Sequence, residues 1–219
     1  MKRSVSRKKC YLILIAVIVL LTLILLYLFN YIPHLKYDNS HFGINTYKSL
    51  TDKDGDGIDD QTDILKNTRK YIKTKPKYES RYYAGGYPDD GYGVCTDVVA
   101  FALKDAGYDL MELLDDDIKE SPESYSIETP DKNIDFRRVS NLKIWFKRNA
   151  ISLTTDIYDI GEWQGGDVII FEGHIGIVSD KRNRDGIPFI IHHANPYQAH
   201  YEEDILPFRS DVVGHYRIS

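Results

Sequence analysis

The stretch DVIIFEGHIGIVS, residues 167–179, decides the fold class of this chain. It holds two runs of β-branched and other apolar residues, 167–171 and 174–179, which have the composition of strands. Between them stands Glu172-Gly173, and a two-residue connection that contains glycine is typical of a tight hairpin turn. The stretch therefore predicts two antiparallel neighbouring strands, with His174 as the first residue of the second strand.

Elements of two kinds lie on either side of this hairpin. After it, two further segments have strand character, at 187–193 and 212–218. Before it, apolar residues recur three and four positions apart, which predicts helices at 64–72, 95–106, 109–118 and 135–146. We expect Asp109, with Glu112, and Asp135 to cap the last two of these helices. Helices followed by an antiparallel sheet indicate an α+β domain.

The charge of the chain is divided unevenly along the sequence. The 219 residues include 28 Lys plus Arg and 33 Asp plus Glu, a formal net charge of -5. Five of the positive charges lie within residues 1–9, which have no acidic residue. The remaining chain is acidic and holds two cysteines, so its composition excludes a disulfide scaffold, a disordered chain and a basic nucleic-acid binder. We expect no nucleic-acid partner.

A long apolar run follows the basic start of the chain. Residues 11–29 contain no charged side chain, and as a helix they would reach about 28 Å, close to the thickness of a hydrocarbon core. No small-residue cleavage site follows, so we expect an uncleaved signal anchor over residues 10–32, in contact with membrane lipid. The positive-inside rule keeps residues 1–9 as a cytoplasmic tail. This predicts a single-pass protein of the cell membrane with an extracytoplasmic C-terminal domain, joined to the anchor by a polar stalk at 33–51.

The segment DKDGDGIDDQTD, residues 52–63, has the spacing of a calcium-binding loop. Such a loop takes oxygen ligands at positions 1, 3, 5, 7 and 12 and needs a glycine at position 6. The expected ligands are three carboxylates, one backbone carbonyl and a final carboxylate, from Asp52, Asp54, Asp56, Ile58 and Asp63. A solvated acidic turn is the alternative. We expect a structural Ca²⁺ that orders the start of the helix at 64–72, and no cofactor for catalysis.

Cys95 is the only cysteine after the anchor, since Cys10 lies at its cytoplasmic end. It is expected in the first turn of a helix, where backbone N–H groups favour a thiolate and lower the pKa from its ordinary value of about 8.5. His174 and His192 lie on predicted neighbouring strands, with alternation that places them on the same face. A cysteine, a base and a polar residue that orients the base can perform nucleophilic catalysis. The alternatives are an inert buried thiol and a zinc site that includes His192 and His193.

This order of cysteine on a helix, histidine on one strand and a polar residue on the next resembles that of papain-like cell-wall peptidases. Five segments are also similar to the bacterial domain-of-unknown-function family 1287, namely 93–99, 131–142, 166–168, 174–180 and 214–217. The resemblance covers roughly residues 63–219. It implies a papain-like domain of the NlpC and CHAP type over 64–219, with Cys95 as nucleophile, His174 as base and His192 as orienting residue. The family commonly has His-Asn where this chain has His192-His193, so His193 and Asn195 remain alternatives for the third position.

Four further residues are candidates for binding the substrate or the oxyanion. Tyr92 precedes the nucleophile closely enough to assist the Cys95 backbone N–H in binding an oxyanion. Arg137 and Arg138 carry guanidinium groups that suit a peptide carboxylate, or else belong to a hydrogen-bond network that holds a loop to the sheet. Asp97 is expected to orient the local backbone.

The family resemblance implies an extracytoplasmic cysteine hydrolase, a peptidase or amidase, that cleaves an amide bond in peptidoglycan. Two functions of other classes remain open at this point. One is a non-catalytic module that binds cell wall or peptide in a papain-like groove. The other is a cysteine acyltransferase, which uses the same residues and differs only in the acceptor.

Overall fold

A computed structural model describes residues 7–219, which form two compact units, one ending at Leu35 and one spanning Lys36–Ser219. Lys2 and Arg3 of the predicted basic tail lie outside the described residues. The first unit is built around helix α1, Arg7–Leu28, whose residues are all exposed. This helix is long and apolar enough to cross a membrane, as a single-pass anchor or a signal sequence would be. Cys10 is exposed on it.

The helices of the second unit precede most of its strands. They are α2 Asp60–Lys73, α3 Cys95–Lys104, α4 Leu110–Glu120, α5 Lys132–Asp135 and α6 Val139–Asn149, with short 3-10 turns at Asn39–Phe42, Pro122–Ser124 and Leu206–Phe208. Asp109 caps α4 as expected, because its side chain accepts from the N–H of Met111.

The predicted cap at Asp135 is wrong. Asp135 ends the short α5 instead, and its carboxylate accepts from the backbone N–H of Asp131. Helix α6 starts only at Val139, with Arg138 in the N-cap position and no side-chain cap.

The sheet of the second unit has seven strands, and every neighbouring pair in it is antiparallel. They are β1 Tyr37–Asp38, β4 Ile151–Ser152, β5 Val168–Phe171, β6 His174–Arg182, β7 Pro188–Ile191, β8 Glu202–Glu203 and β9 Val212–Arg217, in the order β4-β9-β5-β6-β7-β8 with β1 beside β6. The predicted hairpin is present, with Phe171 opposite His174 and Gly173 at a φ of 76°. A separate parallel pair joins β2 Lys77–Tyr78 to β3 Tyr92–Gly93.

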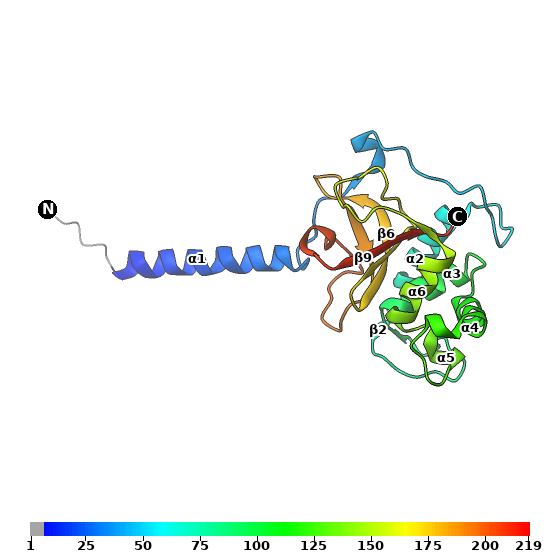
Figure 1. Cartoon of the computed structure of the whole chain (residues 1–219). Coiled ribbons are helices and arrows are strands. Elements are labelled where there is room, and N and C mark those ends of the chain that lie inside the picture. Colours follow the sequence, from blue (N-terminus) through cyan, green and yellow to red (C-terminus); the bar gives the residue numbers. More distant parts are fainter. Residues whose placement is uncertain (1–6) are drawn as a thin grey trace. The chain divides into compact units, whose positions relative to one another are not determined.

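Apolar residues of the sheet divide between two cores, as alternation along a strand requires. Ile175 and Ile177 pack with residues of α2, α3, α4 and α6 in the larger core. Val178 and Ile190 pack on the other side with Trp163. Figure 1 shows α3, α4, α5 and α6 gathered on one side of the strands. The unit is therefore a mixed helix and antiparallel-sheet domain, as the sequence predicts.

The predicted polar stalk is not a stalk from Tyr37 onward. Tyr37 pairs with Arg182 at the end of β6, and the buried Arg182 guanidinium donates to Oδ1 of Asn39 at 2.6 Å. Farther along, the Tyr47 hydroxyl donates to the carbonyl oxygen of Ser219 at 2.9 Å. The polar side chains of this segment thus serve hydrogen bonds to the domain, which composition alone does not distinguish from exposure to solvent.

Candidate active site

Cys95 is the first residue of α3, and a buried ion pair shapes the turn that carries it. Asp97 accepts the backbone N–H of Val94, the N-cap residue, at 2.8 Å. Its two carboxylate oxygens also accept from Nε and Nη2 of Arg137, at 2.7 and 2.9 Å. Both side chains are almost fully buried, and Nη1 of Arg137 donates to the Arg81 carbonyl oxygen. Asp97 therefore orients the local backbone, as expected.

The same contacts decide between the two predicted roles of Arg137. With its guanidinium buried and directed at Asp97 and a carbonyl oxygen, it belongs to the network that holds a loop to α3, and it does not present its fork to a peptide carboxylate. Arg138 is half-exposed and lies 3.3 Å from the carboxylate of Asp135.

The thiol of Cys95 is half-buried beside the start of β6. Burial raises its pKa to about 11, an effect opposed by the backbone N–H groups of Ile175 and Thr96, which donate toward the sulfur. The expectation of a lowered pKa is therefore wrong, because desolvation of the thiolate outweighs the helix terminus. In residues 7–219 no hydrogen bond joins Cys95 to His174 directly, although the backbone N–H of Ile175, the residue after His174, donates toward the Cys95 sulfur.

The two predicted histidines are in contact. Nε2 of His174 lies 2.9 Å from Nδ1 of His192, and the rings are perpendicular. The alternation of residues along β6 and β7 thus places the pair correctly. Gly176 permits the close approach of the strands, since a Cβ there would lie 2.8 Å from Cγ2 of Ile190 and 3.2 Å from Cβ of His192.

Glu203 extends this contact by one more residue, which the sequence does not reveal. Its Oε2 lies 3.1 Å from Nε2 of the buried His192, and Nε2 of Gln198 lies 3.3 Å from the same oxygen. Glu203 comes from the two-residue strand β8, paired with β7 through Ile190. A strand this short has no recognisable alternation, so only the sheet pairing brings this carboxylate to the histidines.

All three histidines of this region are uncharged near neutral pH. Burial lowers the pKa of His174 and of His192 to about 3, and that of His193 to about 4. The positive charge of Arg209 acts in the same direction on His174 and His192.

The structure distinguishes the three candidates for the orienting residue. His192 contacts His174, whereas Oδ1 of Asn195 accepts from the N–H of Tyr197. His193 packs between the rings of Tyr78 and Tyr201, with centroids at 5.2 and 5.1 Å.

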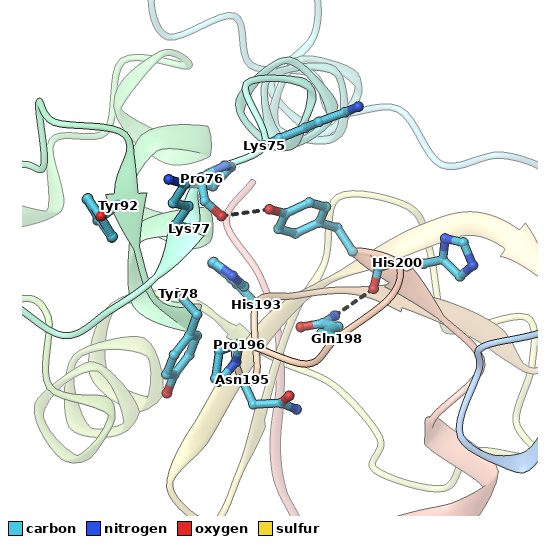
Figure 2. A pocket seen from close by; sticks show the side chains of 11 residues that line it. Lys75, Pro76, Lys77, Tyr78, Tyr92, His193, Asn195, Pro196, Gln198 and His200 are labelled. Atoms are coloured by element: carbon cyan, nitrogen blue, oxygen red, sulfur yellow. Dashed lines mark hydrogen bonds between the residues drawn. The ribbon is translucent and has the colours of Figure 1, made fainter. Parts of the chain in front are cut away.

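A groove lies beside the histidines, with a volume of about 420 Å³. One wall is the segment Lys75, Pro76, Lys77 and Tyr78 with Tyr92, and the other is the loop after β7, from His193 to Tyr201. Figure 2 shows His193 between Tyr78 and Lys77, in the middle of these side chains. Tyr92 thus lines the groove, and the Arg81 guanidinium covers its ring at 3.6 Å.

Tyr78 is a further residue that the sequence does not single out. Burial raises the pKa of its phenol, and its partner in the β2-β3 ladder is Gly93, two residues before Cys95. This pairing places Tyr78 beside the segment that leads into Cys95.

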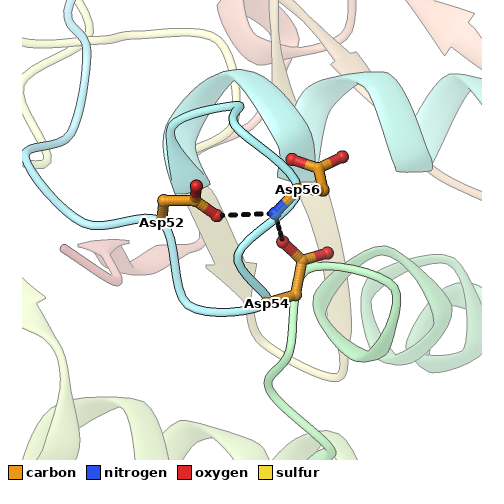
Figure 3. A group of neighbouring side chains, drawn as sticks. All are labelled: Asp52, Asp54 and Asp56. Atoms are coloured by element: carbon orange, nitrogen blue, oxygen red, sulfur yellow. Dashed lines mark hydrogen bonds between the residues drawn. The ribbon is translucent and has the colours of Figure 1, made fainter.

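Three of the predicted calcium ligands lie together in the loop before α2. Carboxylate oxygens of Asp52, Asp54 and Asp56 come within 4.8 Å of one another (Figure 3). Asp63 lies in the first turn of α2, where it accepts from Asn67 and lies 3.5 Å from Nζ of Lys66. Its pKa is raised by burial and by the negative charges of Asp56 and Asp54. The exposed triad fits a divalent cation, and Asp63 would have to exchange its lysine contact for the metal.

Comparison with known proteins identifies the family of the chain. The family described as "Domain of unknown function (DUF1287)" matches residues 65–218. The chain is similar to the "Uncharacterized protein YijF" of Escherichia coli (strain K12), with 39% identity over an alignment of 151 residues; the match covers 65% of this chain and 72% of that protein. No solved structure matches it. The family match includes the cysteine, both histidines and Glu203, and the chain belongs to the DUF1287 family.

Proposed function

We propose that this protein is a membrane-anchored cysteine hydrolase with a papain-like domain, and that it cleaves an amide bond in peptidoglycan. The observation that carries the proposal is the relay from His174 through His192 to Glu203, at 2.9 and 3.1 Å, beside a thiol at a helix start. A buried chain of two imidazoles that ends on a carboxylate costs desolvation, and orienting a base is a function that explains it.

The relay defines which ring nitrogen takes the proton. A carboxylate only accepts hydrogen bonds, so Nε2 of His192 carries the proton and its Nδ1 is the acceptor. His174 then donates from Nε2 to that acceptor, which leaves a lone pair on its own Nδ1. This is the nitrogen that can act as a base. Glu203 thereby fixes the tautomers of both histidines.

The reaction follows in two halves. In the first, Sγ of Cys95 attacks the carbonyl carbon while its proton moves to Nδ1 of His174, because a thiol with a raised pKa is not ionised in advance. The C–N bond then breaks, and His174 gives the proton to the leaving amine. In the second half, His174 takes a proton from water as the hydroxyl attacks the thioester. The C–S bond breaks, the acid leaves and the thiol regains its proton.

In residues 7–219 no hydrogen bond joins Cys95 to His174, which is compatible with this course. Hydrogen bonds of a catalytic pair are often long without substrate and tighten in the complex. The backbone N–H of Cys95, at the start of α3, is the group we propose for the oxyanion.

The location of the substrate follows from the anchor. We propose that α1 is a retained anchor, in contact with membrane lipid, and that the enzyme domain faces the extracytoplasmic side, where peptidoglycan lies. A structural Ca²⁺ on Asp52, Asp54 and Asp56 would offset two of the three negative charges beside α2 and so stabilise the start of that helix.

Turnover of peptidoglycan tests the proposal. Purified full chain in detergent should release soluble peptides or new amino groups from purified sacculi, and Cys95→Ala should abolish the release. Cys10→Ala is the matched control, since it removes the exposed thiol of α1 and should leave the rate unchanged. Equal products from Cys95→Ala and the natural chain would refute the hydrolase. Binding of sacculi without products would indicate a binding module, and products formed only when an added amine is present would indicate an acyltransferase.

A further inference from the structure

We infer that the groove between Lys75–Tyr78 and the loop His193–Tyr201 is the substrate site for an extended peptide that carries carboxylate groups. The inference rests on the proposed function in naming a peptide, and it adds the chemical class and the binding residues. The groove volume of about 420 Å³ suits a few residues of extended chain.

The groove is continuous with the proposed catalytic residues. Tyr78 lines it and is paired with Gly93, two residues before Cys95. At the opposite wall, His193 lines the groove and directly follows His192 of the relay. Both walls of the groove are therefore formed by residues next to the proposed catalytic residues, as a site for a peptide that is cut at Cys95 requires.

The charge of the groove is opposite to that of the chain as a whole. Its lining includes Lys75 and Lys77 and no acidic side chain, although the chain has a net charge of -5. In residues 7–219 neither ammonium group lies within 4.0 Å of a carboxylate. By contrast, Lys70 of the preceding helix lies 2.8 Å from the carboxylate of Asp105. Two exposed lysines without acidic partners complement an anionic ligand.

Aromatic rings and a buried polar atom complete the site. Tyr78, Tyr92 and Tyr201 line the groove, and the Tyr201 hydroxyl donates to the Pro76 carbonyl oxygen at 2.7 Å, which fixes the two walls to each other. His193 is 4% exposed, and its Nδ1 has no hydrogen-bond partner in the described chain. A buried polar atom without a hydrogen-bond partner lowers the stability of the fold by about 1–3 kcal/mol. The open space that this ring borders is the groove, and a peptide there offers both N–H and C=O groups.

The lining favours carboxylates over phosphates. Arginine, whose planar fork matches phosphate oxygens, does not occur among the lining residues. Lysine acts as a point charge, so it suits single carboxylates that are spaced along a peptide. Together with tyrosine faces and a neighbouring thiol that attacks amides, this points to an acidic peptide and not to a phosphate polymer.

Peptide binding tests the inference without catalysis. The full chain in detergent, with Cys95→Ala, is titrated with a fluorescent five-residue peptide that contains two glutamates, and with the same peptide that contains two glutamines. We expect Kd for the glutamate peptide to be at least tenfold lower. In the variant Lys75→Gln/Lys77→Gln the difference should fall to about twofold, since exposed ion pairs contribute about 0.2–1 kcal/mol each. Lys143→Gln/Lys147→Gln, an equal charge change on α6, should keep it.

Three results would overturn the inference. These are equal affinity for the two peptides, an undiminished preference in Lys75→Gln/Lys77→Gln, and a hexaphosphate chain that competes as well as the glutamate peptide at equal charge. Failure of the hydrolase is a separate result. If Cys95→Ala binds the glutamate peptide in the groove while the natural chain cleaves nothing, the binding site stands and the enzyme proposal falls.

Discussion

Replacing Glu203 by leucine should lower kcat about a thousandfold and leave KM nearly unchanged. The Glu203 carboxylate contacts His192 at 3.1 Å, and His192 contacts His174, the proposed base, at 2.9 Å. With the His192 ring between, its charge is roughly 8 Å from the imidazolium that forms on His174, an attraction of about 2 kcal/mol at an effective dielectric constant of about 20. The charge-assisted hydrogen bond that sets the tautomers adds about 1.5–3 kcal/mol. A total of about 4 kcal/mol corresponds to about a thousandfold in rate.

Glu203→Gln separates these two contributions. Its amide oxygen can still accept from Nε2 of His192, so the tautomers are kept while the charge is lost, and the expected decrease in kcat is about thirtyfold. Glu202→Gln is the matched control on the same strand, because the Glu202 carboxylate accepts from Arg69 and Lys36 and not from a histidine. It should change kcat by less than about threefold.

The assay is steady-state cleavage of a soluble stem peptide, combined with nitrogen-15 NMR of the histidine side chains. In the natural chain the NMR signals should report Nε2–H for both His174 and His192. In Glu203→Leu, His192 should change to the Nδ1–H tautomer, and His174 should change with it. The proton then occupies Nδ1 of His174, the nitrogen that acts as the base in the natural chain. Unchanged tautomers in Glu203→Leu, or a kcat within threefold of the natural chain, would refute the reasoning.

Two further predictions concern the thiol and the acidic loop. With a pKa of about 11, Cys95 should react with iodoacetamide about tenfold faster for each pH unit from pH 7 to 10, because the thiolate fraction rises with pH below the pKa. The rate is measured in a Cys10→Ala background, and a rate that levels off below pH 8.5 would show a lowered pKa instead. Calcium at about a hundred times its Kd should add about 2.7 kcal/mol of stability and raise the Tm of the chelator-treated chain by about 5–10 °C. Asp54→Asn should abolish this increase, and the control Asp116→Asn on α4 should keep it. The same Tm with calcium and with chelator would remove the metal from the proposal.

Local patterns were sufficient for much of the fold. The hairpin around Glu172-Gly173, the helix that starts at Cys95 and the cap at Asp109 each depend on residues within a few positions of one another. Patterns failed where a distant partner decides the outcome. Residues 37–49 read as a polar stalk until the contacts of Asn39 and Tyr47 with the domain are seen. The Asp135 cap failed for a local reason, because its carboxylate accepts from the N–H of Asp131, four residues earlier.

The candidate site was likewise predicted only in part from the sequence. Strand alternation predicted that His174 and His192 share a face, and the pairing of β6 with β7 brings them into contact. The pKa of Cys95 depends on how much water the packed domain excludes, and helix position alone predicted the wrong direction. Arg137 was assigned a role only by its buried partner.

The amino-acid sequence by itself determined most of the elements and the family motifs, since these follow from periodicity and from residues near one another in the chain. It also singled out Cys95, His174 and His192 as candidates for nucleophile, base and orienting residue. Only the tertiary structure decided that Glu203 contacts His192, that Tyr78 pairs with Gly93 beside Cys95 and that the Lys75–Tyr78 segment faces the loop after β7. The physical reason is that proton position and ligand binding depend on distances of about 3 Å between groups far apart in sequence, which only sheet pairing and packing set.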